Sequence, residues 1–202
     1  EPSGLIPKRD AVVHARTGTG KTLVYLIPAV EQICRRPPPG IGVLIVSPSR
    51  ELALQIARDA QALLTYHALQ VLALVGGKRR ENDEKVMRRR QPSMIVATPA
   101  RLLDHIEYTT GFRSQLEGLG MLVLDECDRL LTETGEDMRM LLSYLPPADR
   151  RRVLLCSATL PSGVLELASQ ICGSDYSLFD CVGGGPATSN TLEQYYAVCP
   201  GV

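Results

Sequence analysis

The chain has 202 residues, of which 45% are hydrophobic and 22% charged, as expected for one globular domain with a buried core rather than for a disordered segment. Its 22 basic and 22 acidic side chains cancel, which argues against a tail-driven, histone-like binder but leaves room for a local basic groove. The six cysteines are widely spaced, with no Cys-x-x-Cys pair, so buried reduced thiols in an intracellular protein are expected rather than zinc ligands or disulfides. No stretch approaches the ~18 apolar residues of a membrane-spanning helix, so no membrane partner is expected.

Short apolar runs alternate with helical patterns along the chain. The apolar runs predict buried strands at Ala11–His14, Val43–Ser47, Val71–Val75, Met94–Ala97, Met121–Asp125 and Val153–Ser157. The segments between them predict helices at Lys21–Arg35, Glu51–Leu64, Ala100–Glu107, Asp137–Leu145 and Ser162–Ile171. This alternation predicts an α/β fold, a three-layer sandwich with a mostly parallel central sheet.

The remaining segments are polar or glycine-rich. Residues 78–91 are charged almost throughout and predict a solvated helix with ion pairs. Gly183–Asn190 predicts a flexible connector, and Tyr195–Cys199 one last short strand. His14 is expected in the core, and His67 and His105 are expected at the surface.

Residues 14–22 read HARTGTGKT and lie between the first strand and an apolar helix. They resemble the phosphate-loop pattern G-x-x-x-x-G-K-[ST], although Ala15 replaces its first glycine. Gly18 and Gly20 allow backbone N–H groups to turn toward a polyphosphate, Lys21 can reach the β and γ phosphates, and the Thr22 hydroxyl can ligate Mg²⁺. ATP and Mg²⁺ are therefore the expected cofactors; the alternative is a glycine-threonine turn without chemical use. The expected cofactor-binding residues are Ala15, Arg16, Thr17, Gly18, Thr19, Gly20, Lys21 and Thr22.

The stretch LVLDECDRLL, residues 122–131, is an apolar run that ends in three closely spaced carboxylates. Such charges repel one another unless a cation lies opposite, and Mg²⁺ bound to ATP would supply that charge. Asp125 is expected to hold the metal together with Thr22, from the end of a strand neighbouring the phosphate loop. Glu126 is expected to orient or deprotonate the attacking water, so Lys21, Asp125 and Glu126 are the candidate catalytic residues. A solvent-exposed strand end is the alternative.

These motifs and others in the same order resemble the DEAD-box family of ATP-dependent RNA helicases. The acidic motif reads Asp-Glu-Cys-Asp at 125–128 in place of Asp-Glu-Ala-Asp. Residues 48–53 (PSRELA) are similar to the family's PTRELA, 76–77 to its glycine pair, and 157–159 to its SAT motif. Residues 98–101 (TPAR) resemble TPGR, with Ala100 in place of glycine. The resemblance implies a RecA-like phosphate-loop fold and RNA-dependent ATP hydrolysis.

The resemblance also implies roles for residues outside the nucleotide site. RNA-backbone contacts with little sequence preference are expected from Pro48, Ser49, Arg50, Glu51, Gly76, Gly77, Thr98, Pro99 and Arg101. None of these motifs contains an aromatic residue on which a base could stack. Arg50 and Arg101 could each pair with a local carboxylate instead. Asp128, Ser157 and Thr159 are expected to couple hydrolysis to RNA unwinding.

The resemblance implies that residues 1–182 form one RecA-like domain and 183–202 a linker toward a second, which would supply arginine fingers and half of the RNA cleft. The segment Glu1–Asp10 does not match the family's adenine-reading motif. The 202 residues alone are therefore expected to be close to inactive. Two alternatives stay open: an ATP-controlled RNA clamp in a larger assembly, and a DNA-directed helicase of the same superfamily.

Overall fold

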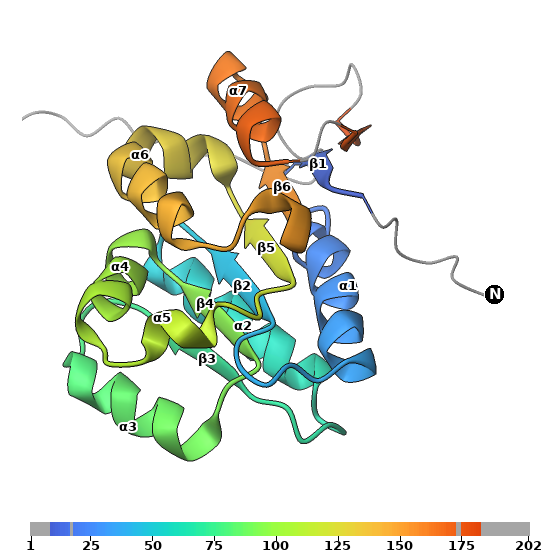
Figure 1. Ribbon diagram of the computed structural model, residues 1–202. Coiled ribbons are helices and arrows are strands. Elements are labelled where there is room, and N and C mark those ends of the chain that lie inside the picture. Colours follow the sequence, from blue (N-terminus) through green and yellow to red (C-terminus); the bar gives the residue numbers. More distant parts are fainter. Residues whose placement is uncertain (1–8, 17, 173–174, 183–202) are drawn as a thin grey trace, which may run out of the picture.

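The computed structural model describes residues 9–16, 18–172 and 175–182. Its centre is a seven-stranded sheet in the order β3-β4-β2-β5-β6-β1-β7, in which every pair is parallel (Figure 1). The strands are β1 Ala11–His14, β2 Val43–Val46, β3 Val71–Leu74, β4 Met94–Ala97, β5 Met121–Leu124, β6 Arg152–Ser157 and β7 Ser177–Asp180. The predicted parallel α/β sandwich is confirmed, and each of the six strands predicted between residues 11 and 157 is present to within one residue at its ends.

Helices cover both faces of the sheet, which makes the three layers. They are α1 Lys21–Arg35, α2 Arg50–Leu63, α3 Arg80–Arg90, α4 Pro99–Tyr108, α5 Phe112–Gln115, α6 Cys127–Tyr144 and α7 Ser162–Ile171, with a 3₁₀ turn at Ala148–Arg150. Buried residues of α1 and α2 share one core cluster, and those of α4, α6 and α7 share the other. Figure 1 shows these two groups on opposite sides of the strands. Among the described residues, no helix has both the length and the apolar character needed to cross a lipid bilayer.

The strands are apolar on both faces because helices cover both. In β5, Leu122 and Leu124 belong to the cluster with α4, α6 and α7, whereas Met121 and Val123 belong to the cluster with α1 and α2. Burial of each such side chain contributes roughly 1.5–3 kcal/mol to folding. The sheet is therefore a rigid base from which loops project at the carboxyl ends of the strands.

Helix α6 differs from its prediction. It begins at Cys127 rather than at Asp137, and it contains a break at Thr134, whose φ of −139° and ψ of 30° are not helical. The Thr134 hydroxyl donates to the carbonyl oxygen of Leu130 at 2.8 Å. This local bond competes with regular helix hydrogen bonding. The polar, glycine-containing sequence at 132–135 also lacks the apolar periodicity that would predict a helix.

Strand β7 was not predicted. It pairs in parallel with β1, so β1 lies inside the sheet between β6 and β7. Its side chains Leu178 and Phe179 are about half exposed, and such a short, solvent-facing edge strand has no buried-strand pattern. The predicted connector and the predicted strand at 195–199 lie outside the described residues.

The predictions for histidine and cysteine need correction. His105 is fully buried rather than at the surface; its ring packs against Phe112, and Nδ1 lies 2.9 Å from the Thr109 hydroxyl. His67 is exposed as predicted, and His14 is only partly buried. Of the described cysteines, all free, three are buried, Cys34 is intermediate and Cys181 is exposed.

Candidate functional site

The loop between β1 and α1 has the backbone shape of a phosphate-binding loop. Gly18 (φ 78°) and Gly20 (φ 85°) both adopt left-handed conformations, which residues with a Cβ adopt only with strain. A Cβ at either position would meet nothing within 4 Å, so the backbone angle, not space, requires glycine. The loop therefore faces open space at the N-terminus of α1, where unpaired N–H groups and the helix dipole favour an anion. Thr17 lies outside the described residues.

Other predicted residues of this loop hold it to the fold. The Ala15 N–H donates to the Ser157 carbonyl at 3.1 Å, and the Thr19 hydroxyl donates to the Arg16 carbonyl at 2.7 Å. The Arg16 guanidinium donates to the carbonyl oxygen of Val182 at 3.2 Å. These groups fix the base of the loop and leave its glycine-rich part for a ligand.

Lys21 is a buried cation without a hydrogen-bonding partner. Lys21 is the first residue of α1 and is 8% exposed, and its Nζ makes no hydrogen bond to any residue that the structure describes. Burying an ammonium group without a partner is costly, so the position favours binding of an anionic ligand.

Asp125 is a buried carboxylate, 4% exposed, directly after β5. Its Oδ2 accepts a hydrogen bond from the Tyr25 hydroxyl at 2.9 Å, and its Oδ1 accepts one from the Glu126 N–H at 3.0 Å. Burial raises the pKa of Asp125 above its usual range, although these bonds and the Lys21 charge act in the opposite direction. A cation at this carboxylate would remove much of the cost of burying its charge.

Tyr25 was missed by the sequence analysis. It is fully buried on α1, four residues after Lys21, and burial together with the Asp125 charge raises its pKa far above its usual range. The phenol therefore stays protonated and donates to Asp125. Strand β6 lies between β1 and β5, so Asp125 does not end the strand next to the phosphate loop, and Tyr25 provides the contact across this gap. The i, i+4 spacing from Lys21 was its only sequence signal.

Glu126 has an unusual backbone conformation, with φ 49° and ψ 53°, and is the N-cap of α6. A non-glycine residue in this region costs about 1–3 kcal/mol and occurs most often at functional sites. Its carboxylate accepts a hydrogen bond from Arg129 at 2.7 Å, and Arg129 also donates to Glu133 at 2.9 Å. The candidate base is thus held at the edge of the site by an exposed arginine.

The segment after β6 is hydrogen-bonded to the acidic turn, which we define as residues 125–128. The Thr159 hydroxyl donates to Asp128 Oδ2 at 2.5 Å, and the Arg129 N–H donates to Oδ1 at 3.1 Å. Partial burial would raise the pKa of Asp128, but the hydrogen bonds, that of Thr159 first, hold it below its usual range. Ser157 is fully buried at the end of β6. The three residues expected to act in coupling, Asp128, Ser157 and Thr159, therefore lie in the acidic turn and in the segment after β6 that is bonded to it.

The residues present fit a nucleotide with a divalent cation. Within the described ranges, no three His, Cys, Asp or Glu side chains gather into a metal-binding group. Mg²⁺ commonly uses only one or two protein ligands together with phosphate oxygens and water, so one buried carboxylate and the Thr22 hydroxyl are sufficient. The partnerless ammonium of Lys21 and the open glycine loop supply the complementary phosphate site.

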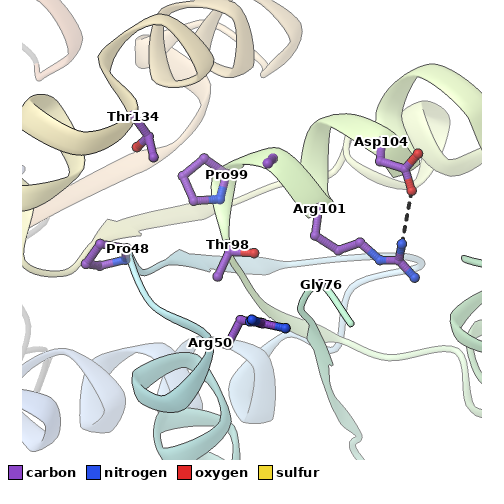
Figure 2. Close-up of a pocket in the computed structure, with 9 residues that line it drawn as sticks. Pro48, Arg50, Gly76, Thr98, Pro99, Arg101, Asp104 and Thr134 are labelled. Carbon is purple, nitrogen blue, oxygen red and sulfur yellow. Dashed lines mark hydrogen bonds and ion pairs between the residues drawn. The ribbon is translucent and has the colours of Figure 1, made fainter. Parts of the chain in front are cut away.

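A second site is a pocket of about 470 Å³ at the starts of α2 and α4. Six of the nine residues predicted to contact RNA line it: Pro48, Arg50, Gly76, Thr98, Pro99 and Arg101. Ala100, Asp104 and Thr134 also line it, the last at the break in α6, whereas Ser49, Glu51 and Gly77 do not. Figure 2 shows how residues from three helices converge on this pocket.

Arg50 is an available cation at this pocket. It is exposed, and the described residues offer it no ion pair within 4.0 Å. Gly77 has φ 94°, so the backbone angle favours glycine there, whereas the only atom near a Cβ would be Arg50 Nη1 at 2.8 Å, the end of a flexible side chain that can move away. The neighbouring Ser49 hydroxyl accepts the Leu52 N–H at 3.2 Å and caps α2.

Arg101 is instead engaged by carboxylates, the alternative that the sequence left open. Its guanidinium donates to Asp83 Oδ2 at 2.7 Å and to Asp104 Oδ2 at 3.2 Å (Figure 2), and its side chain is 11% exposed. These bonds join α4 to α3, which holds Asp83. Ala100 does not have a positive φ and lies in the first turn of α4, so alanine in place of glycine causes no strain.

Comparisons with known proteins agree with this geometry. A family model described as DEAD/DEAH box helicase matches residues 3–167. The chain is 37% identical over 201 residues to DEAD-box ATP-dependent RNA helicase 26 of Oryza sativa, covering 97% of this chain and 37% of the rice protein. It is 40% identical over 200 residues to helicase 27 of Arabidopsis thaliana, covering 97% of this chain and 31% of that protein.

Solved structures are also similar. Mss116p bound to ssRNA and AMP-PNP matches with a TM-score of 0.82 and 29% identity, over 92% of this chain and 39% of that one. A DEAD box protein from Methanococcus jannaschii matches with a TM-score of 0.73 and 33% identity, over 86% of this chain and 45% of that one. The chain spans less than two fifths of the length of the two curated relatives. It belongs to the DEAD/DEAH box helicase family.

Proposed function

We propose that this chain is the nucleotide-binding domain of an RNA-dependent ATPase that unwinds or remodels RNA duplexes. The observation that carries this proposal is the buried Asp125 carboxylate together with the Lys21 ammonium, whose charge acts on Asp125 but which has no hydrogen-bonding partner among the described residues. Opposite charges arranged in this way suit a phosphate bearing a divalent cation. The relatives' names and the Mss116p complex with ssRNA and AMP-PNP support the choice of ATP and RNA.

In this proposal each residue has a distinct role. The backbone N–H groups of the glycine loop and Lys21 would bind the phosphates, while Thr22 and Asp125 would hold Mg²⁺, which would neutralise charge on the phosphates. Tyr25 orients Asp125 through its hydroxyl. Glu126 accepts a proton from the attacking water, for which its carboxylate must turn from Arg129 toward the nucleotide.

RNA would lie along the pocket at the starts of α2 and α4. Arg50 supplies a cation and the first turn of α4 supplies free N–H groups, and both suit backbone phosphates. Arg101, which lines the pocket, is held in place by its hydrogen bonds to Asp83 and Asp104. No aromatic residue lines the pocket, so contacts to the sugar-phosphate backbone, with little sequence preference, are expected. A second RecA-like domain would complete the cleft, which is in keeping with the chain's share of its relatives' length.

The test is phosphate release by the full-length protein with ATP and Mg²⁺, with and without single-stranded RNA, alongside unwinding of matched short RNA and DNA duplexes. We expect RNA to stimulate hydrolysis and the RNA duplex to be unwound. Glu126→Gln should slow hydrolysis by about 10²-fold, as expected for loss of a positioned base, while nucleotide binding persists. Stimulation by DNA alone would support the DNA-directed alternative, and stable RNA holding without unwinding would support the clamp.

A further inference from the structure

His14, the last residue of β1, contacts two segments that are distant in the sequence. Its Nδ1 lies 3.0 Å from Asp180 Oδ1 at the end of β7, and its Nε2 lies 3.1 Å from the carbonyl oxygen of Ala158. The His14 side chain is 17% exposed; its contact with Ala158 is partly buried, whereas its contact with Asp180 is exposed to water. His14 directly precedes the phosphate-loop residues 15–22 and is not among the residues assigned to nucleotide or RNA.

Both partners of the imidazole ring are hydrogen-bond acceptors. A neutral imidazole carries one N–H and can donate to one of them, whereas the doubly protonated ring donates to both. A ring between a carboxylate and a carbonyl oxygen is therefore suited to a charge-assisted bond on one side and a bond to the backbone on the other.

The two contacts of His14 connect the acidic turn with the end of β7 and the phosphate loop. On one side, Ala158 precedes Thr159, whose hydroxyl donates to Asp128 in the acidic turn. On the other, Asp180 Oδ1 accepts the Val182 N–H at 3.0 Å, and the Val182 carbonyl accepts the Arg16 bond from the phosphate loop. The phosphate loop, the acidic turn and the end of β7 are thus joined through one imidazole ring.

We propose that His14 is a positioning residue that holds the Ala158 carbonyl so that Thr159 keeps its bond to Asp128. It also anchors this segment to Asp180, at the point where the described chain leaves the sheet. Without the ring, the segment 157–159 retains its link through the Ala15 N–H to Ser157 but loses the bond nearest Thr159. The inference rests on the proposed function, since its enzymatic readout is the coupling of ATP hydrolysis to RNA unwinding.

The first experiment compares His14→Ala, His14→Gln and the matched control His67→Ala in the full-length protein. For each we measure KM for ATP, RNA-stimulated kcat and the rate of RNA duplex unwinding. In His14→Ala the ratio of unwinding to hydrolysis should fall about tenfold, the effect of losing one partly buried hydrogen bond, while KM for ATP stays within about twofold. The glutamine amide can still donate to the Ala158 carbonyl, so His14→Gln should recover most of the ratio, and His67→Ala should equal the wild type.

A second pair of variants tests the carboxylate side of the ring. In Asp180→Asn the amide can accept from a protonated ring or donate to a neutral one, so the ratio should be retained. Asp180→Ala should lower it in the same direction as His14→Ala. An unchanged ratio in both alanine variants would overturn the proposal, as would a parallel fall of hydrolysis, unwinding and Tm in His14→Ala that glutamine does not restore.

Hydrogen exchange of the full-length protein supplies a readout that does not depend on RNA. Amides of the segment 157–160 should exchange faster in His14→Ala than in wild type or His67→Ala, while those of α3 stay unchanged. If the wild type lacks RNA-stimulated hydrolysis, the proposed function fails on its own; if segment 157–160 exchanges at the wild-type rate, the role of His14 fails, whatever the enzyme does.

Discussion

The nucleotide site and the α3–α4 region both bury charged groups, but they do so in opposite ways. At the nucleotide site, Lys21 has no hydrogen-bonding partner and burial raises the pKa of Asp125. Between α3 and α4, Arg101 is shared by Asp83 and Asp104, and Arg80 by Asp104 and Glu84. A buried charge without a hydrogen-bonding partner suits ligand binding, whereas a charge held by carboxylates of a neighbouring helix joins two elements of the fold.

Removal of Lys21 gives the largest expected effect. Lys21→Ala in the full-length protein should reduce RNA-stimulated hydrolysis by about 10³-fold or more, because the ammonium stabilises charge that develops on the phosphates. Its Tm without nucleotide should fall much less than that of a variant that breaks the α3–α4 pairing, because Lys21 has no hydrogen bond to a described residue to lose and only its charge acts on Asp125. Phosphate release and thermal unfolding measured on one preparation test both parts; a large fall in Tm would contradict the distinction between the two regions.

The opposite result is expected for Arg101. Arg101→Met should lower the free energy of unfolding by about 3 kcal/mol, since it leaves the buried Asp83 without its main partner. RNA affinity at fixed salt should change by less than about threefold. Denaturant unfolding and RNA titration provide the two measurements.

Arg50→Ala is the matched control for Arg101, since Arg50 lines the same pocket and is exposed. It should weaken RNA binding and reduce the salt dependence of binding by about one counterion, with unchanged stability. If Arg101→Met abolished RNA binding in a folded protein and Arg50→Ala did not, Arg101 would be the phosphate ligand.

Tyr25→Phe tests the support of Asp125 with a smaller expected effect. Loss of the hydroxyl removes one bond that stabilises the ionised carboxylate, so Mg²⁺ affinity should fall about tenfold, as for other residues that orient metal ligands. The same loss raises the pKa of Asp125 further. Mg²⁺-dependent nucleotide binding is lost as pH falls and the carboxylate becomes protonated, so this loss should begin at a higher pH in the variant. Titrations of nucleotide binding across pH check this; identical pH profiles would contradict it.

The smallest effect is expected for Cys127→Ala, which restores the family's usual residue. Cys127 is fully buried at the start of α6, and burial raises the pKa of its thiol to about 12, so it stays neutral and packs as a small apolar group. Loss of one sulfur should cost about 1 kcal/mol or less of stability and leave kcat unchanged at saturating Mg²⁺. A tenfold fall in kcat would assign the thiol a chemical role.

The sequence predicts those parts of the molecule whose determinants are local. The strands are continuous apolar runs because helices cover both faces, and the phosphate loop has its glycines at the two positions that need positive φ. The contact of Tyr25 with Asp125 spans 100 residues and depends on β6 lying between β1 and β5, which no local pattern encodes. The pairing of Arg101 with Asp83 likewise depends on how α3 packs against α4.

Other misses have their own physical causes. The first half of α6 was missed because Thr134 and Gly135 interrupt the helical pattern. His105 looked like a surface residue because its carboxylate partner Asp83 comes from α3, while its hydroxyl partner Thr109 directly follows α4. Tertiary contacts allow the polar His105 side chain to be buried, whereas the break in α6 depends on the local bond from Thr134 to Leu130.

Helix α6 also determines how far apart the two sites lie. It begins at Cys127, directly after its N-cap Glu126 in the acidic turn, and its break at Thr134 lines the pocket at the starts of α2 and α4. Eight residues at a rise of about 1.5 Å each separate these points by roughly 12 Å. The segment from Glu126 to Thr134 thus connects the acidic turn to the wall of the pocket, so a small rotation of the acidic turn would change the pocket wall directly.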